Sequence, residues 1–252
     1  MLAVTALAIA VTALMSERVA AASQCGSFDV YILAQTWPES QCLTLKSDAQ
    51  DTCLEAKPDN AWSIHGLWPS SLTPGGYPRH CKGADFSRDA LAGLLPQLTA
   101  AWPNLGVARS TSADAKSAVD NDYSFWRYEW EKHGICATVC DTNIGSQHDY
   151  FAQALSLYDR YDIGKVLDAA GIVPDSTATI TASSVSNAVS QAYGATPALS
   201  CTYDKDKNST NLNGLWLCLK PGSFDPVDCP ADEVPEHSRC PADVLLPAAP
   251  SP

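Results

Sequence analysis

The chain has 252 residues, of which 46% are hydrophobic and 17% are charged, a composition that suits one globular domain and demands no second one. Its net charge is −12, from 28 acidic and 16 basic side chains. This negative net charge excludes binding of nucleic acid through an overall positive charge of the protein. A polyanionic substrate would have to be held by a local cluster of cations and by stacking.

The N-terminus has the pattern of a secretory signal peptide. Residues 2–14 are almost wholly apolar, and Ala20 and Ala22 offer a small-residue cleavage site ahead of Ser23. The apolar run is too short to span a bilayer. We therefore expect residues 1–22 to be removed in the secretory pathway, with no membrane attachment afterwards.

Two strands are predicted near the start of the mature chain. Residues 28–37 (FDVYILAQTW) are rich in aromatic and β-branched side chains and end at Pro38. A cysteine-bearing loop follows, and residues 61–70 (AWSIHGLWPS) form the second strand. Its alternation predicts that Trp62 and His65 face opposite sides of the sheet.

Helices are predicted for the middle of the chain. Apolar residues recur at helical spacing over residues 86–102, where Pro96 is expected to kink or divide the helix. The polar residues 109–120 are predicted as a loop, followed by a helix over FWRYEWEKHGIC (125–136) that ends at Gly134 as a left-handed cap. Two or three further helices are indicated within residues 150–161, 163–170 and 185–193.

Strands return near the C-terminus, over residues 199–203 and 215–219, with four cysteines around them. Strands at both ends with helices between them predict an α+β fold. We expect a central antiparallel sheet with helices packed around it, in a single disulfide-stapled domain over residues 23–240. The Pro- and Ala-rich residues 241–252 are expected to form a loose tail.

The helix predicted over residues 125–136 carries chemically active side chains. Glu129 and His133 are four residues apart and so share one helix face, with Lys132 on its flank. At such spacings these residue types usually form solvated surface pairs. The surrounding aromatic residues favour another interpretation. Rings over most of the helix circumference would place the polar trio at the edge of an apolar cleft, where pKa values shift.

A second histidine, His65, lies near Trp68 in a predicted strand. A strand histidine is more often structural than catalytic. Two histidines in aromatic surroundings nevertheless allow a neutral imidazole to act as base and a protonated one as acid in a phosphoryl or acyl transfer. The remaining histidines have no such context and are predicted to be surface residues: His80, His148 and His237.

The ribonuclease T2 family of secreted, lysosomal or vacuolar endoribonucleases has two active-site segments, which this sequence resembles in WSIHGLWPS (62–70) and FWRYEWEKHGIC (125–136). The two motifs occur in the right order and at a familiar separation. Further similar segments extend the resemblance over most of residues 27–240: ILAQTWP (32–38), LLPQLTAAWPNL (94–105) and YFAQALSLYDRYDI to GIVP.

The resemblance implies an enzyme that cleaves single-stranded RNA by transphosphorylation and releases a 2′,3′-cyclic phosphate. It assigns His133 as the base and His65 as the acid, with Glu129 and Lys132 stabilising the phosphorane. Such a reaction needs no metal or other cofactor, because the nucleophile belongs to the substrate, and it excludes DNA, which lacks the 2′-hydroxyl. We expect a monomer that works outside the cell, or in a vacuole or lysosome.

One position departs from the family's pattern. Family members commonly carry histidine immediately before the motif glutamate, where this sequence has Tyr128. Tyrosine can donate a hydrogen bond but supplies no positive charge at neutral pH, so weaker phosphate binding is expected. Trp68, Trp126 and Gln35 are candidates for base and phosphate subsites, although core packing explains a tryptophan there at least as well.

Ten cysteines in a secreted chain predict five disulfides. The resemblance implies three of these pairs: Cys81 with Cys136, Cys201 with Cys240, and Cys218 with Cys229. The other four cysteines allow three pairings, of which we prefer Cys42 with Cys53 and Cys25 with Cys140. The sequence also contains one acceptor triplet for N-glycosylation, beginning at Asn208.

Two other classes of protein remain open. A member of the same fold that has lost catalysis would use its aromatic residues to hold RNA or a protein partner, and Tyr128 keeps this alternative open. A zinc hydrolase would take its ligands from His65, His80, His133 and a cysteine. No CxxC or HExxH motif supports that site, so no metal is expected.

Overall fold

The structure is a computed structural model that describes residues 25–47, 51–53, 61–73, 77–108, 118–229 and 240–249. The predicted signal peptide and the last three residues of the predicted tail lie outside these ranges. Within them, no helix combines the length and the apolar character needed to cross a bilayer.

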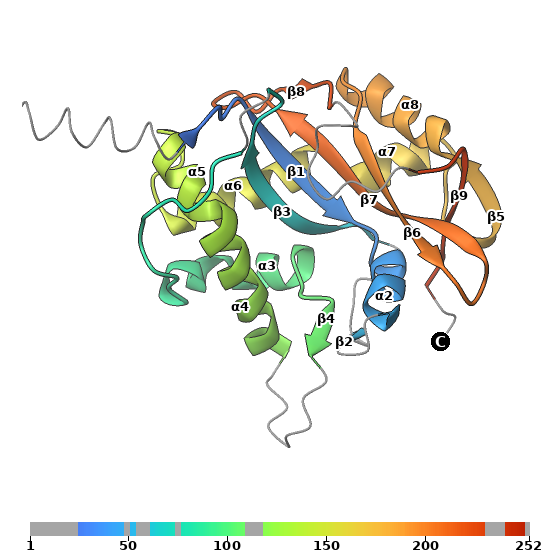
Figure 1. Cartoon of the computed structure of the whole chain (residues 1–252), viewed down its shortest axis with the longest axis horizontal. Helices are drawn as coiled ribbons and strands as arrows, with labels where there is room; N and C mark the ends of the chain where they lie inside the picture. The colour runs from blue at the N-terminus through green and yellow to red at the C-terminus, as the bar shows by residue number, and fades with distance from the viewer. Residues whose placement is uncertain are drawn as a thin grey trace, which may run out of the picture.

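A seven-stranded sheet forms the centre of the fold (Figure 1). Its strands are β1 (Val30–Thr36), β3 (Ser63–Ser70), β5 (Asp175–Thr181), β6 (Ala198–Asp204), β7 (Ser209–Leu219), β8 (Pro226–Val227) and β9 (Asp243–Leu246). The main path runs β3-β1-β7-β9-β5, and β6 and β8 also pair with β7. All of these pairings are antiparallel except that of β7 with β9. A small separate sheet joins β2 (Asp51–Cys53) to β4 (Gly106–Ala108).

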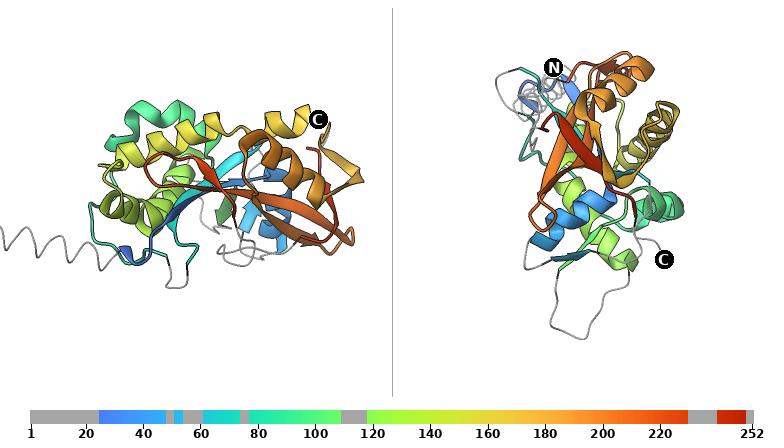
Figure 2. Two further views of the ribbon diagram at one scale, coloured as in Figure 1. Left: turned by 90° about the horizontal axis from the view of Figure 1, so that it is seen from above. Right: turned by 90° about the vertical axis from the view of Figure 1, so that its right-hand side faces the viewer.

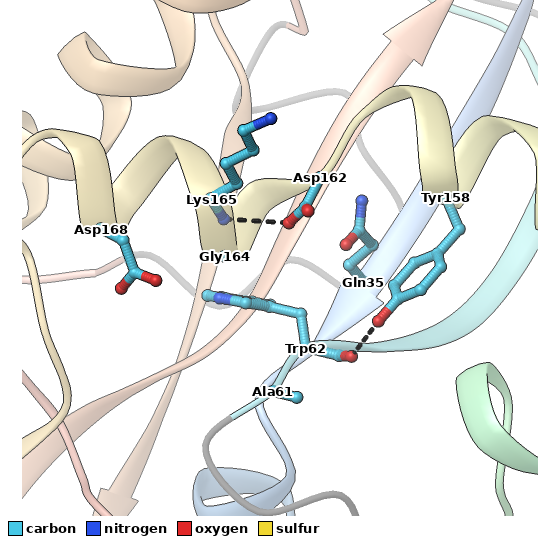
Figure 3. Close-up of a pocket in the computed structure, with 8 residues that line it drawn as sticks. All are labelled: Gln35, Ala61, Trp62, Tyr158, Asp162, Gly164, Lys165 and Asp168. Atoms are coloured by element: carbon cyan, nitrogen blue, oxygen red, sulfur yellow. Dashed lines mark hydrogen bonds between the residues drawn. The ribbon is translucent and has the colours of Figure 1, made fainter.

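Helices pack around the sheet. They are α2 (Pro38–Ser47), the 3₁₀ helix η1 (Asp89–Leu94), α3 (Leu95–Ala101), α4 (Ala118–Glu129), η2 (Trp130–Gly134), α5 (Ile135–Cys140), α6 (Gln147–Arg160), α7 (Ile163–Ala169) and α8 (Ala182–Tyr193). Figure 2 shows α3, α6 and α7 on one side of the sheet. Two tyrosine hydroxyls of α6 fix it there, because Tyr150 donates to the backbone oxygen of Leu67 and Tyr158 to that of Trp62 (Figure 3). The predicted α+β fold is confirmed.

Gly134 does not end the helix of the second motif, as the sequence suggested. Its φ is −62°, in the right-handed region, and the chain continues from the π-helical turn η2 directly into α5. A Cβ atom at this position would overlap the ring of Trp130 and lie 3.0 Å from Cδ1 of Tyr150. Glycine is therefore needed here for close packing rather than for a left-handed cap. Gly194 does cap α8 with a φ of 77°, as predicted.

Two segments are more ordered than their composition indicated. The predicted cysteine-bearing loop after Trp37 begins with α2, whose first residue is Pro38, a position where the fixed φ of proline suits a helix. The predicted loose tail contains β9, which pairs with β5 and β7. The run Val244–Leu246 is buried there, because three consecutive apolar residues cover the edge of the core. The prolines and alanines around these three residues dominate the composition of the segment, so its composition did not predict the strand.

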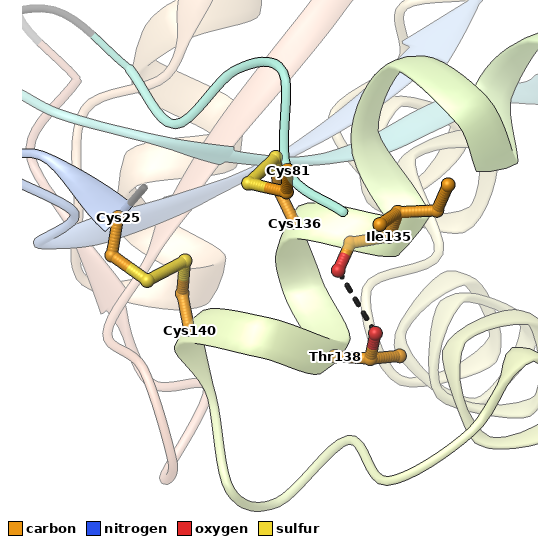
Figure 4. The surroundings of a disulfide bond; sticks show 6 residues. All are labelled: Cys25, Cys81, Ile135, Cys136, Thr138 and Cys140. Atoms are coloured by element: carbon orange, nitrogen blue, oxygen red, sulfur yellow. Dashed lines mark hydrogen bonds between the residues drawn. A yellow bond between two sulfur atoms is a disulfide. The ribbon is translucent and has the colours of Figure 1, made fainter. Parts of the chain in front are cut away.

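Five disulfides staple the described chain, and their pairs coincide with those expected: Cys25–Cys140, Cys42–Cys53, Cys81–Cys136, Cys201–Cys240 and Cys218–Cys229. Two of them end on α5, as Figure 4 shows. Cys136 and Cys140 lie one turn apart and hold the loop at Cys81 and the N-terminal segment at Cys25. The helix that follows the second motif is thus tied covalently to two distant parts of the chain.

Candidate active site

His65 is the extra residue of a β-bulge. Ala34 of β1 pairs with Gly66 and the next residue, Gln35, pairs with Ile64, so the register of the ladder skips His65. A bulge interrupts strand alternation and redirects the side chain that it carries. The backbone oxygen of His65 is fixed by the indole N–H of the buried Trp102, at 2.9 Å. The imidazole itself is half-buried.

Trp68 brings the predicted catalytic residues together. Its ring centroid lies 5.2 Å from that of His65, edge-on at 80°, and 5.3 Å from that of His133, stacked at 28°. Its indole N–H donates a 2.9 Å hydrogen bond to Oε2 of Glu129. One side chain of β3 thus contacts residues from both sequence motifs, and both histidines lie against the same indole.

Gly66 makes room for this contact between Trp68 and Glu129. A Cβ atom at residue 66 would overlap both the indole nitrogen of Trp68 and the carboxylate of Glu129. The second residue of the HG pair in the first motif is therefore a steric requirement of the site. Any larger residue would push Trp68 away from Glu129.

The π-helical turn η2 presents the second motif. Glu129 ends α4, and Lys132 and His133 lie within η2. π-Helical turns are rare in proteins overall, but those that occur are often at functional sites. A π-turn is wider than an α-helical turn and so changes the direction of the side chains that it carries. Trp130 anchors the turn, since its buried indole donates a 2.9 Å hydrogen bond to the backbone oxygen of Ala84. Glu129 and His133 consequently both face Trp68.

The pKa of His133 is held well below its usual value. Burial is the largest cause, followed by the positive charges of Lys132 and of His65. The buried Nδ1 of His133 meets no hydrogen-bond partner in the described part of the chain. His133 is therefore neutral well into the acidic range.

The exposed Tyr128 and the half-buried Lys132 lie together at the rim of the site. The ammonium nitrogen of Lys132 lies 5.1 Å from the ring centroid of Tyr128, one helical turn away. Tyr128 is 51% exposed. The position where the family commonly has histidine is thus solvent-accessible and adjacent to the site's lysine, and its ring takes part in a cation–π contact.

Two of the predicted substrate-binding residues belong to the core instead. Trp126 is fully buried, and its indole donates to the backbone oxygen of Trp102 at 2.8 Å. Gln35 is also fully buried, and its amide donates to the backbone oxygen of Tyr161 at 3.0 Å. Because side chains alternate along β1, Gln35 faces the helices while Ala34 packs near Trp68.

Phe125 was not predicted as a site residue, but its ring centroid lies 5.8 Å from that of His65. Its place four residues before Glu129, on the same helix face, is the signal that could have identified it.

The other histidines lie away from this group. His80 and His148 are exposed, and His237 lies outside the described residues. The zinc alternative needs a cysteine thiolate as ligand, but all ten cysteines are joined in disulfides. The ligand set proposed for a zinc hydrolase is therefore not available.

Comparison with known proteins identifies the family to which this chain is similar. Residues 28–229 match the model of the ribonuclease T2 family. "Ribonuclease DdI" of Dictyostelium discoideum is 32% identical over 224 residues, 89% of this chain and 88% of that protein. "Ribonuclease Oy" of Magallana gigas is 33% identical over 216 residues, 85% of this chain and 92% of that protein.

Solved structures agree with the sequence comparison. RNase NT in complex with 5′-AMP superposes with a TM-score of 0.70 at 27% identity, covering 88% of this chain and 99% of that one. An RNase-related protein from Calystegia sepium gives a TM-score of 0.68 at 28% identity, covering 88% and 98%. With its two motifs meeting at Trp68 and the family model matching most of its length, the chain belongs to the ribonuclease T2 family.

Proposed function

We propose that this protein is a metal-independent endoribonuclease that cleaves single-stranded RNA to 2′,3′-cyclic phosphate products. The observation that carries the proposal is the contact of both His65 and His133 with the ring of Trp68. Two imidazoles of different environment at one site are what a proton-in, proton-out reaction requires. Family membership supports ribonuclease activity, and the residues supply the mechanism.

In the proposed first step, neutral His133 takes the proton of a ribose 2′-hydroxyl. The freed oxygen attacks the adjacent phosphorus, and the bond from phosphorus to the 5′ oxygen of the next nucleotide breaks. Protonated His65 gives its proton to that leaving oxygen. The ammonium of Lys132 stabilises the negative charge that develops on the phosphorane, and Glu129, fixed by Trp68, orients its neighbours through hydrogen bonds.

The two roles predict activity that is greatest at mildly acidic pH. Because the pKa of His133 is lowered, the base stays neutral as the pH falls below its usual value of 6.5. The acid, His65, has to be protonated, and protonation is favoured by the same fall in pH. The working window therefore lies on the acidic side of neutrality. A rate that rises steadily to pH 9 would contradict this assignment of acid and base.

We also propose that the protein passes through the secretory pathway and carries a glycan on Asn208. One relative is named "Extracellular ribonuclease LE" and another "Intracellular ribonuclease LX", so relatives differ in location. Five disulfides favour an oxidising compartment for this chain. Asn208 is exposed on the turn between β6 and β7, with its side-chain oxygen held by the hydroxyl of Tyr203.

The test is to incubate the purified protein and its His133→Ala variant with single-stranded RNA and with defined dinucleotides. We expect a cyclic phosphate from the unmodified protein, a large loss of rate in the variant, and no cleavage of DNA. Chelators should have no effect. Products that end in a 3′-hydroxyl and a 5′-phosphate would overturn the mechanism, because no 2′-oxygen attack forms them.

The alternative of a binding protein without catalysis keeps one supporting observation, the exposed Tyr128 in place of the family's common histidine. It predicts that the protein binds single-stranded RNA without cleaving it. In that case the His133→Ala variant and the unmodified protein would leave the RNA equally intact.

A further inference from the structure

A cavity of about 450 Å³ lies between the start of α7 and the ends of β1 and β3 (Figure 3). It shares no lining residue with the group around Trp68. Gln35 lines it from β1, on the helix-covered face of the sheet. Cavities of this size are typical of sites for small molecules.

Gln35 supplies an unsatisfied acceptor to this cavity. The residue is fully buried, and its amide nitrogen is used by the backbone oxygen of Tyr161. Its side-chain oxygen meets no hydrogen-bond partner within the described ranges. In Figure 3 that oxygen points toward the space beside Trp62. A buried carbonyl without a partner is costly, so this atom favours a ligand that donates a hydrogen bond.

The rest of the lining is rich in acceptors and negative charge. Asp162 caps the N-terminus of α7, where its Oδ1 accepts the backbone N–H of Lys165, and Asp168 lies near the end of the helix; both residues line the cavity and are exposed. The hydroxyl of Tyr158 donates its proton to the backbone oxygen of Trp62, which leaves its own oxygen as an acceptor. Lys165 is the cation of the lining, and Figure 3 shows its side chain running away from Trp62.

Trp62 gives the cavity an apolar and π-electron surface. Its side chain is only 3% exposed, and the indole lies beneath the first turn of α7 in Figure 3. Aliphatic carbons can pack on such a ring, and a cation beside its face is attracted by the ring quadrupole. The net charge of −12 adds a general attraction for positive ligands and a repulsion for anions.

We propose that this cavity binds a small aliphatic ammonium ion. The ammonium group has three N–H donors and no acceptor, which matches a lining of the Gln35 oxygen, the Tyr158 oxygen and two carboxylates. The alkyl part packs on Trp62. A nucleotide fits less well, because its phosphate would meet Asp162 and Asp168 across a cavity whose lysine extends outward.

The probe for this proposal is 1,4-diaminobutane, titrated into ¹⁵N-labelled protein while the indole N–H resonances of its seven tryptophans are followed. A Trp62→Phe variant identifies the resonance of Trp62. We expect that resonance to shift in a saturable way. Two matched substitutions of exposed residues on α7 test the charge: Asp168→Lys should weaken binding by about fivefold, and Lys165→Glu should strengthen it by about as much.

Four results would overturn the proposal. The first is an unmoved Trp62 resonance at millimolar diamine, and the second is an equal shift with potassium chloride at the same ionic strength. The third is a shift that neither charge substitution changes. Fourth, if adenosine 5′-phosphate moves the Trp62 resonance at lower concentration than the diamine, the cavity is a nucleotide site instead. None of these outcomes depends on whether the protein cleaves RNA.

Discussion

Lys132 acts on the site in two ways that can be separated by experiment. Its charge lowers the pKa of His133, and its ammonium is proposed to stabilise the phosphorane. The first effect belongs to the free enzyme and sets where the acidic limb of the pH profile falls. The second belongs to the transition state and sets the height of the profile.

Replacing Lys132 by Met should therefore lower kcat/KM by about 100-fold and move its acidic limb to higher pH. The direction of the shift follows because removal of a neighbouring positive charge lets His133 bind its proton more tightly. The measurement is kcat/KM for a dinucleotide over the acidic to neutral range. Lys205→Met, an exposed lysine between β6 and β7, is the matched control and should change neither property.

Tyr128 can contribute through its ring, through its hydroxyl, or through neither. The ring contacts the ammonium of Lys132, while the hydroxyl is a hydrogen-bond donor at the rim of the site. Substitutions that retain one of these features and remove the other distinguish the roles.

We expect Tyr128→His to lower KM for RNA, because a histidine that is protonated at acidic pH adds a positive charge for phosphate. Tyr128→Phe should leave kcat/KM within about twofold if the ring is what matters, and Tyr128→Leu should lower it through the loss of a contact with Lys132. Steady-state kinetics on one RNA substrate compares the three variants. An unchanged KM in Tyr128→His would refute a phosphate-binding role for this position.

At the scale of elements, the site is built where two regular elements are interrupted. A β-bulge in β3 carries His65, and a π-helical turn after α4 carries Lys132 and His133. Each interruption adds a residue to the regular repeat of its strand or helix. Each is fixed by a tryptophan indole that donates a hydrogen bond to a backbone oxygen. The geometry therefore depends on packing that lies behind the reacting groups.

Gly66 is the most sensitive point of this packing. Gly66→Ala should lower kcat/KM by about 100-fold, because its Cβ would force Trp68 and Glu129 apart and so displace both histidines. Activity and thermal unfolding are measured together. The control is Gly93→Ala in η1, where a Cβ meets nothing within 4 Å, and it should leave activity unchanged. Full activity in Gly66→Ala would mean that the contact of Trp68 with Glu129 is dispensable.

These interruptions mark the limit of what the sequence alone could predict. The strands and helices that carry His65 and Glu129 follow from periodicity, and the quoted motifs indicated the family. The bulge and the π-turn could not be predicted, since they arise when indoles from distant elements fit against them. Likewise, the motif placed Gln35 beside the substrate, but the alternation of β1 with its neighbours turned it toward the helices.

At the scale of the whole molecule, one buried carboxyl group makes the free energy of unfolding depend on pH. Asp122 in α4 is 2% exposed, and its carboxylate accepts a 2.7 Å hydrogen bond from the backbone N–H of Asn104. Burial raises the pKa of Asp122 to about 6. A carboxyl whose pKa is higher in the folded than in the unfolded chain stabilises the fold at low pH and loses that contribution as pH rises through the folded value.

We predict that the free energy of unfolding falls by up to about 3 kcal/mol between pH 4 and pH 7 through this one residue. Asp122→Asn keeps an oxygen for the N–H of Asn104 and removes the titration, so its stability should vary less with pH over that interval. Urea denaturation at several pH values measures the difference. Parallel curves for the two proteins would show that Asp122 does not titrate in this range.

The position of β7 has a consequence for how the protein is made. This strand pairs with β1, β6, β8 and β9, and it begins at Ser209, late in the chain. During translation, β1 and β3 leave the ribosome long before the strand that completes their sheet, so an apolar edge waits unpaired. Cys81 and Cys136 both precede β7 and can be oxidised meanwhile. The half of the molecule that precedes β7 therefore has to avoid edge-to-edge aggregation until its central strand has been synthesised.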